Sequence, residues 1–374
     1  MANAGGANAV SGATPSVAHP ARPGDLDADW SALWEELEAI PHHPSPLSQP
    51  RTAIFRLRRG LDFIAHVRFR PSRAIAHLRP YPPPFRHVEV PSEGGVTIAG
   101  WLGPQHRTSP SPWGIILVPG LFSTKDDSAH RGRAIKMWQH WRIPLMAIDL
   151  RGFGESGGIN SAGWKEGHDV LACARFLAAE TGVKRVAVVA ESLGGAAALN
   201  ALALDGEETF PLLTAGVLCW SPFMDARDAV TYISEKPPLG HAFESAFLGF
   251  RRLLRIKSHG MYERFDAFLD DAARVYGLSG FEELCERASP KAKVATMRGP
   301  ALIVHASDDP IVPVRHARRM ERYATGRDNI HLLLTDWGGH TGFEPMEPQW
   351  YWELTSRYFG RLNGVRLQNL AGHV

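Results

Sequence analysis

The chain has 374 residues, of which 44% are hydrophobic and 21% charged, close to the averages of globular domains. Lys and Arg total 41 and Asp and Glu 39, so the net charge of +2 gives no electrostatic reason to expect a nucleic-acid partner. No apolar run approaches the length that a transmembrane helix needs. We therefore expect a soluble protein with one large domain plus insertions, or with two domains.

The chain begins with a polar, low-complexity segment and a basic one. Residues 1–24 are rich in Ala, Gly, Ser and Pro, which predicts a disordered tail without the features of a secretory signal. Residues 25–85 are expected to form a helical, basic extension. Within it, residues 51–79 carry many arginines and one acid, Asp62, with apolar residues at helical spacing. This amphipathic helix would either pack on the main body with its arginines in water, or contact a membrane surface or acidic partner.

From residue 86 onward, strand patterns alternate with helix patterns. Two short strands joined across Gly94-Gly95 predict a β-hairpin. Alternation of buried strands with helices predicts a mostly parallel sheet with helices on both faces. The further strands are expected at 113–120, 143–150, 185–190, 214–221, 300–306 and 329–337, and helices at 128–142, 161–181, from 194 onward, 313–324 and 347–361.

The alternation is interrupted once. Residues 223–297 show mostly helical patterns, which predicts a helical cap inserted between the two parts of an α/β core, 86–222 and 298–364. Aromatic and sulfur side chains in this segment are candidates for an apolar acyl-binding pocket, although helical spacing of such residues is also typical of an ordinary core. These candidates are Phe223, Met224, Phe243 and Phe247.

The strongest chemical signal is a serine in a strand–turn–helix setting. An apolar strand ends at Ala190, a tight turn holds Ser192, and a helix begins near Gly194. This pattern is typical of a nucleophile elbow, G-x-S-x-G, with alanine in place of the first glycine. Ser192 is therefore the candidate nucleophile, and a serine that only caps a helix is the structural alternative.

A serine nucleophile needs a base within hydrogen-bonding reach and a carboxylate that orients the base. Asp308 and Asp309 both follow the strand 300–306, and the residues alone leave either as the acid. His340 lies in a glycine-containing loop after the last strand and is the candidate base. His305, inside a strand, and His316, on an expected surface helix, have weaker claims.

Hydrolysis through an acyl-enzyme also needs donors for the oxyanion. The backbone amide after the nucleophile belongs to Leu193, and the amide after Val118-Pro119-Gly120 belongs to Leu121. We expect these two amides to form the oxyanion hole.

Neither the cysteines nor an acidic cluster in the sequence predicts a metal site. Cys173, Cys219 and Cys285 are odd in number and far apart, which predicts neither a disulfide framework nor a zinc site and favours a reducing, cytoplasmic compartment. The cluster Asp126, Asp127 and His130 is interpreted as a solvated loop and helix start rather than a metal site. No metal ion or cofactor is therefore expected.

Residues 149–156 read D-L-R-G-F-G-E-S, and together with the serine turn they resemble the α/β-hydrolase family over residues 86–362. The segments RPYPPPFR, RFDAFLDDAARVYGLSGFEELCERASP, DDP and GGHTGF are similar to its YheT-like branch of esterases and lipid-handling hydrolases. The resemblance implies an α/β-hydrolase fold. It also implies that Asp309, which precedes Pro-Ile-Val-Pro, is the acid of a Ser192–Asp309–His340 triad.

The resemblance implies cleavage of small-molecule carboxylic esters, with acyl lipids or thioesters among the candidate substrates. A peptidase or perhydrolase would use the same triad. The alternative from another class is a non-catalytic lipid-binding or interaction protein on the same fold. The sequence leaves the natural substrate and the oligomeric state open.

Overall fold

One sheet forms the centre of the protein, and its carboxyl edge carries the predicted site residues. The structure, a computed structural model, describes residues 29–42, 81–104, 111–121, 123–234 and 265–372. Eight strands lie in the order β1-β2-β4-β3-β5-β6-β7-β8. They are β1 (Arg86–Ser92), β2 (Val96–Gly103), β3 (Trp113–Val118), β4 (Leu145–Ile148), β5 (Arg185–Glu191), β6 (Val217–Trp220), β7 (Ala301–Ala306) and β8 (Ile330–Thr335).

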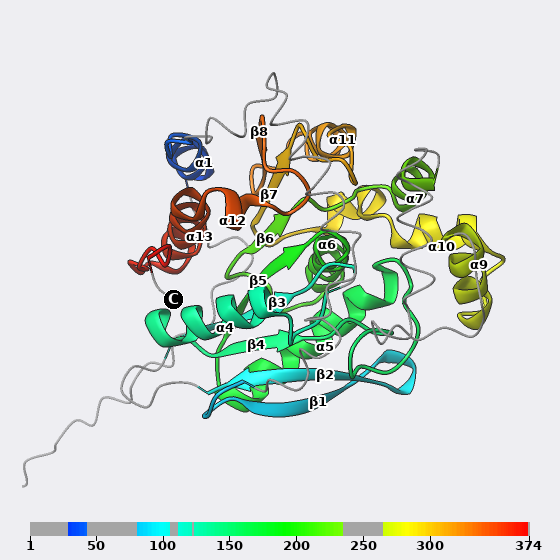
Figure 1. Cartoon of the computed structure of the whole chain (residues 1–374), viewed down its shortest axis with the longest axis horizontal. Helices are drawn as coiled ribbons and strands as arrows, with labels where there is room; N and C mark the ends of the chain where they lie inside the picture. The colour runs from blue at the N-terminus through cyan, green and yellow to red at the C-terminus, as the bar shows by residue number, and fades with distance from the viewer. Residues whose placement is uncertain (1–28, 43–80, 105–110, 122, 235–264, 373–374) are drawn as a thin grey trace, which may run out of the picture.

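Strand β2 runs in the direction opposite to the other strands of the sheet. It pairs antiparallel with β1 and with β4, and the remaining adjacent strands from β4 to β8 are parallel. Figure 1 shows β1 and β2 at one edge of the sheet and β7 and β8 at the other. The carboxyl ends of the parallel strands therefore share one rim, where ligands bind in sheets of this kind.

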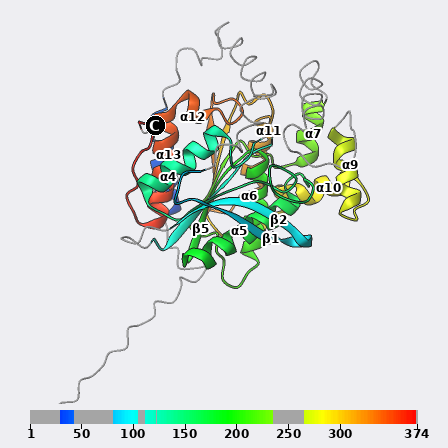
Figure 2. The same ribbon diagram turned by 60° about the horizontal axis from the view of Figure 1, so that its bottom comes forward.

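Helices cover both faces of the sheet. They are α1 (Trp30–Glu38), α4 (Ser128–Trp141), α5 (Trp164–Thr181), α6 (Leu193–Gly206), α7 (Ala226–Ser234), α9 (Phe265–Val275), α10 (Phe281–Ala288), α11 (Arg315–Tyr323), α12 (Phe343–Met346) and α13 (Pro348–Asn363), with 3-10 helices at Glu93–Gly95 and Pro290–Thr296. Figures 1 and 2 place α1, α4 and α13 on one face and α5 and α6 on the other.

Strand side chains alternate between two hydrophobic clusters. In β5, Val186 and Val188 join the cluster with α5 and α6, whereas Ala187 and Val189 join the cluster with α4 and α13. This alternation follows from the period of two in a strand, and every residue of β3, β4, β6 and β7 is buried. The continuous apolar runs in the sequence are thus strands buried on both sides.

The structure confirms the predicted hairpin and the predicted alternation of strands and helices. Gly94 and Gly95, both at positive φ, lie in the turn between β1 and β2. The helix predicted for 161–181 begins at Trp164 and ends at Thr181, where Gly182 adopts φ 76° and donates its amide to the carbonyl of Ala178. The sequence therefore predicted the fold class correctly.

The described part of residues 223–297 is helical. α7, α9 and α10 lie together beside α5 and α6 (Figure 1), and apolar residues of α9 and α10 such as Phe268 and Leu284 belong to the same hydrophobic cluster. The division into a core and a cap stays a proposal. Residues 1–24, the basic segment 51–79, Phe243 and Phe247 lie outside the described residues.

The N-terminal extension contributes one described helix. Asp29 caps α1 by accepting a hydrogen bond from the amide of Ala32, and Leu33 and Leu37 are buried against the face that carries α13. The indole of Trp34 donates to the carbonyl of Asp328, near the start of β8. Within the described ranges, no helix combines the length and hydropathy that a membrane span requires.

Candidate active site

Three segments distant in the sequence meet at the carboxyl rim of the sheet. Ser192 directly follows β5, Asp309 follows β7, and His340 follows β8. His340 Nε2 lies 2.8 Å from Ser192 Oγ. Its Nδ1 lies 2.9 Å and 3.1 Å from the two carboxylate oxygens of Asp309. The three side chains form a continuous hydrogen-bonded chain.

Ser192 occupies a backbone conformation that non-glycine residues rarely adopt. Its φ is 50° and its ψ is −115°, and its amide donates to the carbonyl of Trp220 at 2.9 Å. The following helix approaches β3 so closely that a Cβ on Gly194 would lie 2.3 Å from the carbonyl oxygen of Pro119. The small residue at position 194 is therefore a steric requirement of the turn.

Asp309 is buried and held in place by the backbone of its own loop. One carboxylate oxygen accepts hydrogen bonds from the amides of Ile311 and Val312, at 2.8 Å and 2.9 Å. Burial raises the pKa of Asp309, but the charge and hydrogen bond of His340 outweigh burial and leave this pKa below its usual value. The residue therefore stays a carboxylate at neutral pH, as an orienting acid must.

Asp308 and His305 lie beside Asp309 in other roles. Asp308 accepts a hydrogen bond from the amide of Gly339, 2.8 Å away, and so holds the loop that carries His340. His305 is buried, and its Nε2 lies 2.9 Å from the carbonyl oxygen of Val312 and 3.8 Å from Asp309. The structure thus places Asp309, rather than Asp308, against the imidazole of His340.

The two amides predicted for the oxyanion hole belong to adjacent segments. Leu193 begins α6, and Leu121 follows Gly120 in the loop after β3. A Cβ on Gly120 would lie 3.3 Å from Cβ of Ser192, so this loop runs next to the nucleophile. Within the described residues, neither amide has a hydrogen-bond acceptor in the protein, which leaves both available to an oxyanion.

A cavity of about 520 Å³ opens beside Ser192 and His340. Its wall comes from the loop after β3, the start of α4, the serine turn and the segment around α12. Phe223 and Met224 are buried in the hydrophobic core instead and do not line it. Their role in an acyl pocket stays a prediction.

The cavity wall contains a charged network that the sequence analysis missed. Arg133, in α4, forms ion pairs with Glu191, the residue before the nucleophile, and with Glu344 in α12. The guanidinium also lies 5.4 Å from the ring centroid of Tyr351. The glutamate next to Ser192 could have indicated a charged group at the site. Its pairing with Arg133 could not be predicted, because Arg133 is 58 residues from Glu191 and 211 residues from Glu344 in the sequence.

A second charged network fixes the loop before α4. Lys125 Nζ lies between the carboxylates of Asp126, Asp149 and Glu155, at 2.8 Å, 3.0 Å and 2.5 Å. These three carboxylates would otherwise have the spacing of a cation site, and the ammonium group occupies their centre. Arg151 similarly forms two hydrogen bonds of 2.6 Å with Asp169 in α5. These ion pairs bind the 149–156 loop to its surroundings.

Two expectations about exposure were wrong. Asp126, Asp127 and His130 were expected in a solvated loop, but all three are buried, because Asp126 accepts a hydrogen bond from Trp101 of β2 and the other two lie in the wall of the catalytic cavity. His316 was expected on the surface of its helix, but it is buried and accepts a hydrogen bond from the amide of Met224 at 3.2 Å. The side of α11 that carries it packs against the segment before α7.

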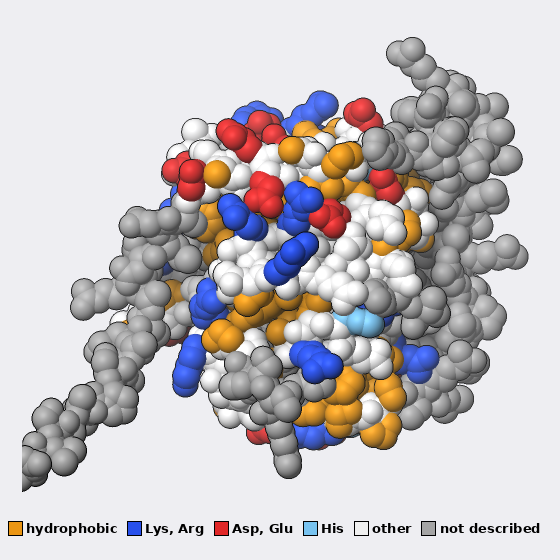
Figure 3. Space-filling model, turned by 90° about the vertical axis from the view of Figure 1, so that its left-hand side faces the viewer, with side chains coloured by type: hydrophobic (Ala, Val, Ile, Leu, Met, Phe, Trp, Pro, Cys, Tyr) orange, Lys and Arg blue, Asp and Glu red, His pale blue; other side chains and the backbone are white. Residues whose placement is uncertain are grey.

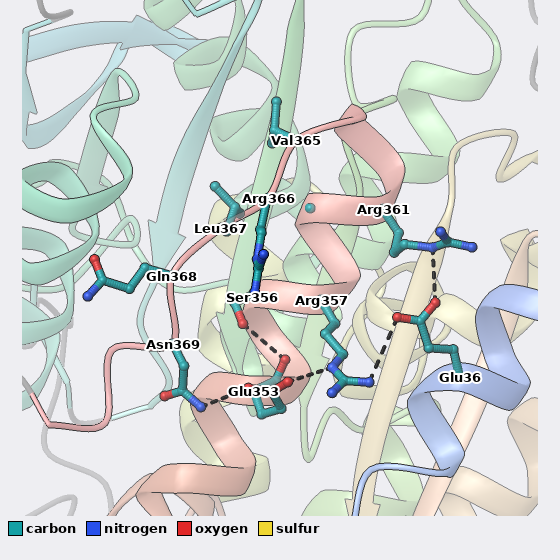
Figure 4. A pocket seen from close by; sticks show the side chains of 11 residues that line it. Glu36, Glu353, Ser356, Arg357, Arg361, Val365, Arg366, Leu367, Gln368 and Asn369 are labelled. Carbon is teal, nitrogen blue, oxygen red and sulfur yellow. Dashed lines mark hydrogen bonds and ion pairs between the residues drawn. The ribbon is translucent and has the colours of Figure 1, made fainter.

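A second cavity, about 670 Å³, lies away from the triad between α1, α13 and residues 365–369 (Figure 4). Arg361 pairs with Glu36, and Arg357 pairs with Glu353, so much of its charge is already matched. Figure 3 shows the same side of the molecule, where basic and acidic side chains lie next to one another. Its described lining residues include no histidine, so the cavity beside Ser192 and His340 is the candidate active site.

Comparison with known proteins places the chain in a family. Residues 115–350, more than half of the chain, match the sequence pattern of the Alpha/beta hydrolase family. The chain belongs to this family. A segment of 77 residues in this hydrolase is also 34% identical to Abhydrolase domain-containing protein 2 of Drosophila melanogaster. That match spans 20% of the hydrolase and 19% of the relative.

Solved structures share the fold of this α/β hydrolase. The esterase Pf2001 of Pyrococcus furiosus aligns with a TM-score of 0.53 at 19% identity, covering 75% of this chain and 91% of the esterase. The α/β hydrolase GrgF of Penicillium sp. sh18 aligns with a TM-score of 0.53 at 17% identity, covering 75% and 99% of the two chains. At these identities the likeness establishes the architecture.

Proposed function

We propose that this α/β hydrolase is a serine esterase that cleaves carboxylic esters through an acyl-enzyme at Ser192. The observation that carries the proposal is the hydrogen-bonded chain Ser192–His340–Asp309, with 2.8 Å between the hydroxyl and the imidazole. Membership of the family and the esterase among the structural neighbours support the same chemistry. The similarity to the YheT-like branch remains part of this proposal.

In the proposed mechanism, His340 Nε2 removes the proton of Ser192 as Oγ attacks the carbonyl carbon of the ester. Asp309 holds the other ring nitrogen and stabilises the imidazolium. The amides of Leu121 and Leu193 donate hydrogen bonds to the oxyanion. His340 then protonates the leaving alcohol. In the second half, water gives a proton to His340 as it attacks the acyl carbon, and His340 passes that proton to Ser192 Oγ as the acid is released.

Two measurements test the proposal. A fluorophosphonate probe should label the wild-type protein at Ser192, and Ser192→Ala should abolish both labelling and hydrolysis of p-nitrophenyl butanoate while leaving the circular dichroism spectrum unchanged. Ser356 lies in the other cavity, so Ser356→Ala is a matched control that should keep full activity. Equal turnover by Ser192→Ala and the wild-type protein would refute the assignment. An unlabelled but folded wild-type protein would favour a non-catalytic role.

A further inference from the structure

The wall of the catalytic cavity is rich in hydrogen-bond acceptors. Three acidic residues, Asp127, Glu191 and Glu344, line it together with His130. Among the described lining residues, Arg133 is the only lysine or arginine, and it is held by Glu191 and Glu344. Negative groups therefore outnumber positive ones beside the nucleophile.

His130 adds an acceptor that has no partner. It lies in the first turn of α4 and is 4% exposed, and burial lowers its pKa to about 4 against the opposing charge of Glu191. The ring is therefore neutral at pH 7. It makes a hydrogen bond to the backbone of Leu117, and its Nε2 has no partner among the described residues. The ring proton must then sit on Nδ1, which leaves Nε2 as a lone-pair acceptor.

A buried acceptor without a partner costs free energy, and a substrate that supplies a donor recovers that cost. We infer that the substrate group held in this cavity carries a hydroxyl or ammonium group, and that His130 accepts a hydrogen bond from it. This inference rests on the proposed esterase function. A purely hydrocarbon group would leave His130 unpaired, and a negatively charged group would be repelled by Asp127, Glu191 and Glu344.

Matched esters test the inference in the wild-type protein. On the acyl side, p-nitrophenyl 3-hydroxybutanoate is compared with its methyl isostere, p-nitrophenyl 3-methylbutanoate. The p-nitrophenyl ester of 3-aminopropanoate adds a cationic group, and the p-nitrophenyl monoester of succinate adds an anionic group. On the alcohol side, 2-hydroxyethyl butanoate is compared with propyl butanoate by acid release. We expect kcat/KM to favour the donor-bearing ester of at least one pair by roughly tenfold, the factor that about 1.4 kcal/mol represents.

Two variants at position 130 connect the preference to the histidine. His130→Phe keeps a flat ring but removes the acceptor, so the ratio of kcat/KM between the donor-bearing ester and its isostere should fall toward one. His130→Gln keeps an acceptor and should retain part of the preference. Because the readout is a ratio of two substrates in one protein, a partial loss of folded enzyme does not change it. If kcat/KM is higher for the hydroxyl ester than for the ammonium ester, His130 contributes more to the preference than the carboxylates do. The reverse order indicates that the carboxylates contribute more.

The inference fails if every isostere is hydrolysed as well as its donor-bearing partner, if the succinate monoester is preferred, or if His130→Phe leaves the preference unchanged. These results would leave ester hydrolysis itself intact. Absence of turnover with every ester, together with absence of fluorophosphonate labelling, would instead refute the proposed function and this inference with it.

Discussion

Replacing Gly194 by alanine is a sharp test of how the nucleophile turn is built. A Cβ at this position would lie 2.3 Å from the carbonyl oxygen of Pro119 and 2.9 Å from that of Val118. Ordinary contact between these atoms begins at 3.4 Å, so the helix or the loop must move by about 1 Å. Both oxygens belong to the backbone, and no side-chain rotation relieves the overlap. The movement must therefore displace either Ser192 or the segment that carries Leu121.

This displacement should affect activity more than stability. Overpacking costs about 1–3 kcal/mol, and the higher helix propensity of alanine offsets about 1 kcal/mol of that. Misplacing reacting groups by about 1 Å costs roughly 10²-fold in rate. We therefore expect kcat/KM of Gly194→Ala for p-nitrophenyl butanoate to fall roughly 100-fold, while urea unfolding shows a loss of about 2 kcal/mol or less.

Gly132 supplies the matched control. It lies in α4, and a Cβ there would meet no atom within 4 Å. Gly132→Ala should keep wild-type activity and gain up to about 1 kcal/mol of stability from helix propensity. If Gly194→Ala hydrolyses the ester as fast as Gly132→Ala, the close approach of helix and loop does not position the nucleophile, and the reasoning is wrong.

Three further predictions concern the charged groups. Lys125→Met should lower the free energy of unfolding by about 3–5 kcal/mol in urea titrations, because it leaves the buried carboxylate of Asp149 without its ammonium partner; a loss below about 1 kcal/mol would contradict this. Asp309→Asn should reduce kcat roughly 10⁴-fold by misorienting the imidazole, whereas Asp308→Asn, which weakens the contact with the amide of Gly339, should lose far less activity; equal losses would contradict the assignment. The pKa of His130 is about 4 in the folded protein and 6.5 ordinarily, so the unfolded chain binds a proton more readily. The free energy of unfolding should therefore be highest above pH 6.5 and fall by up to about 3 kcal/mol toward pH 4. In acid titrations, His130→Gln should reduce this loss.

Local patterns in the amino-acid sequence were enough to predict the scaffold. Buried strands appeared as short apolar runs, and the small residues around Ser192 appeared as a strand–turn–helix pattern, because both features are local and depend on a few adjacent residues. The chain order of serine, acid and histidine followed from the same alternation of strands and loops. These patterns were sufficient for the fold class and for the candidate nucleophile and base.

Which side chains contact one another at the site depends on the packing of the whole fold. The tertiary structure placed Asp309 rather than Asp308 against His340, buried His316, and brought Arg133 between Glu191 and Glu344. Such pairings depend on how separate helices and loops pack around the sheet rim, and local periodicity carries no information about them. The acidic side chains and the histidine around the catalytic cavity come together through the same packing.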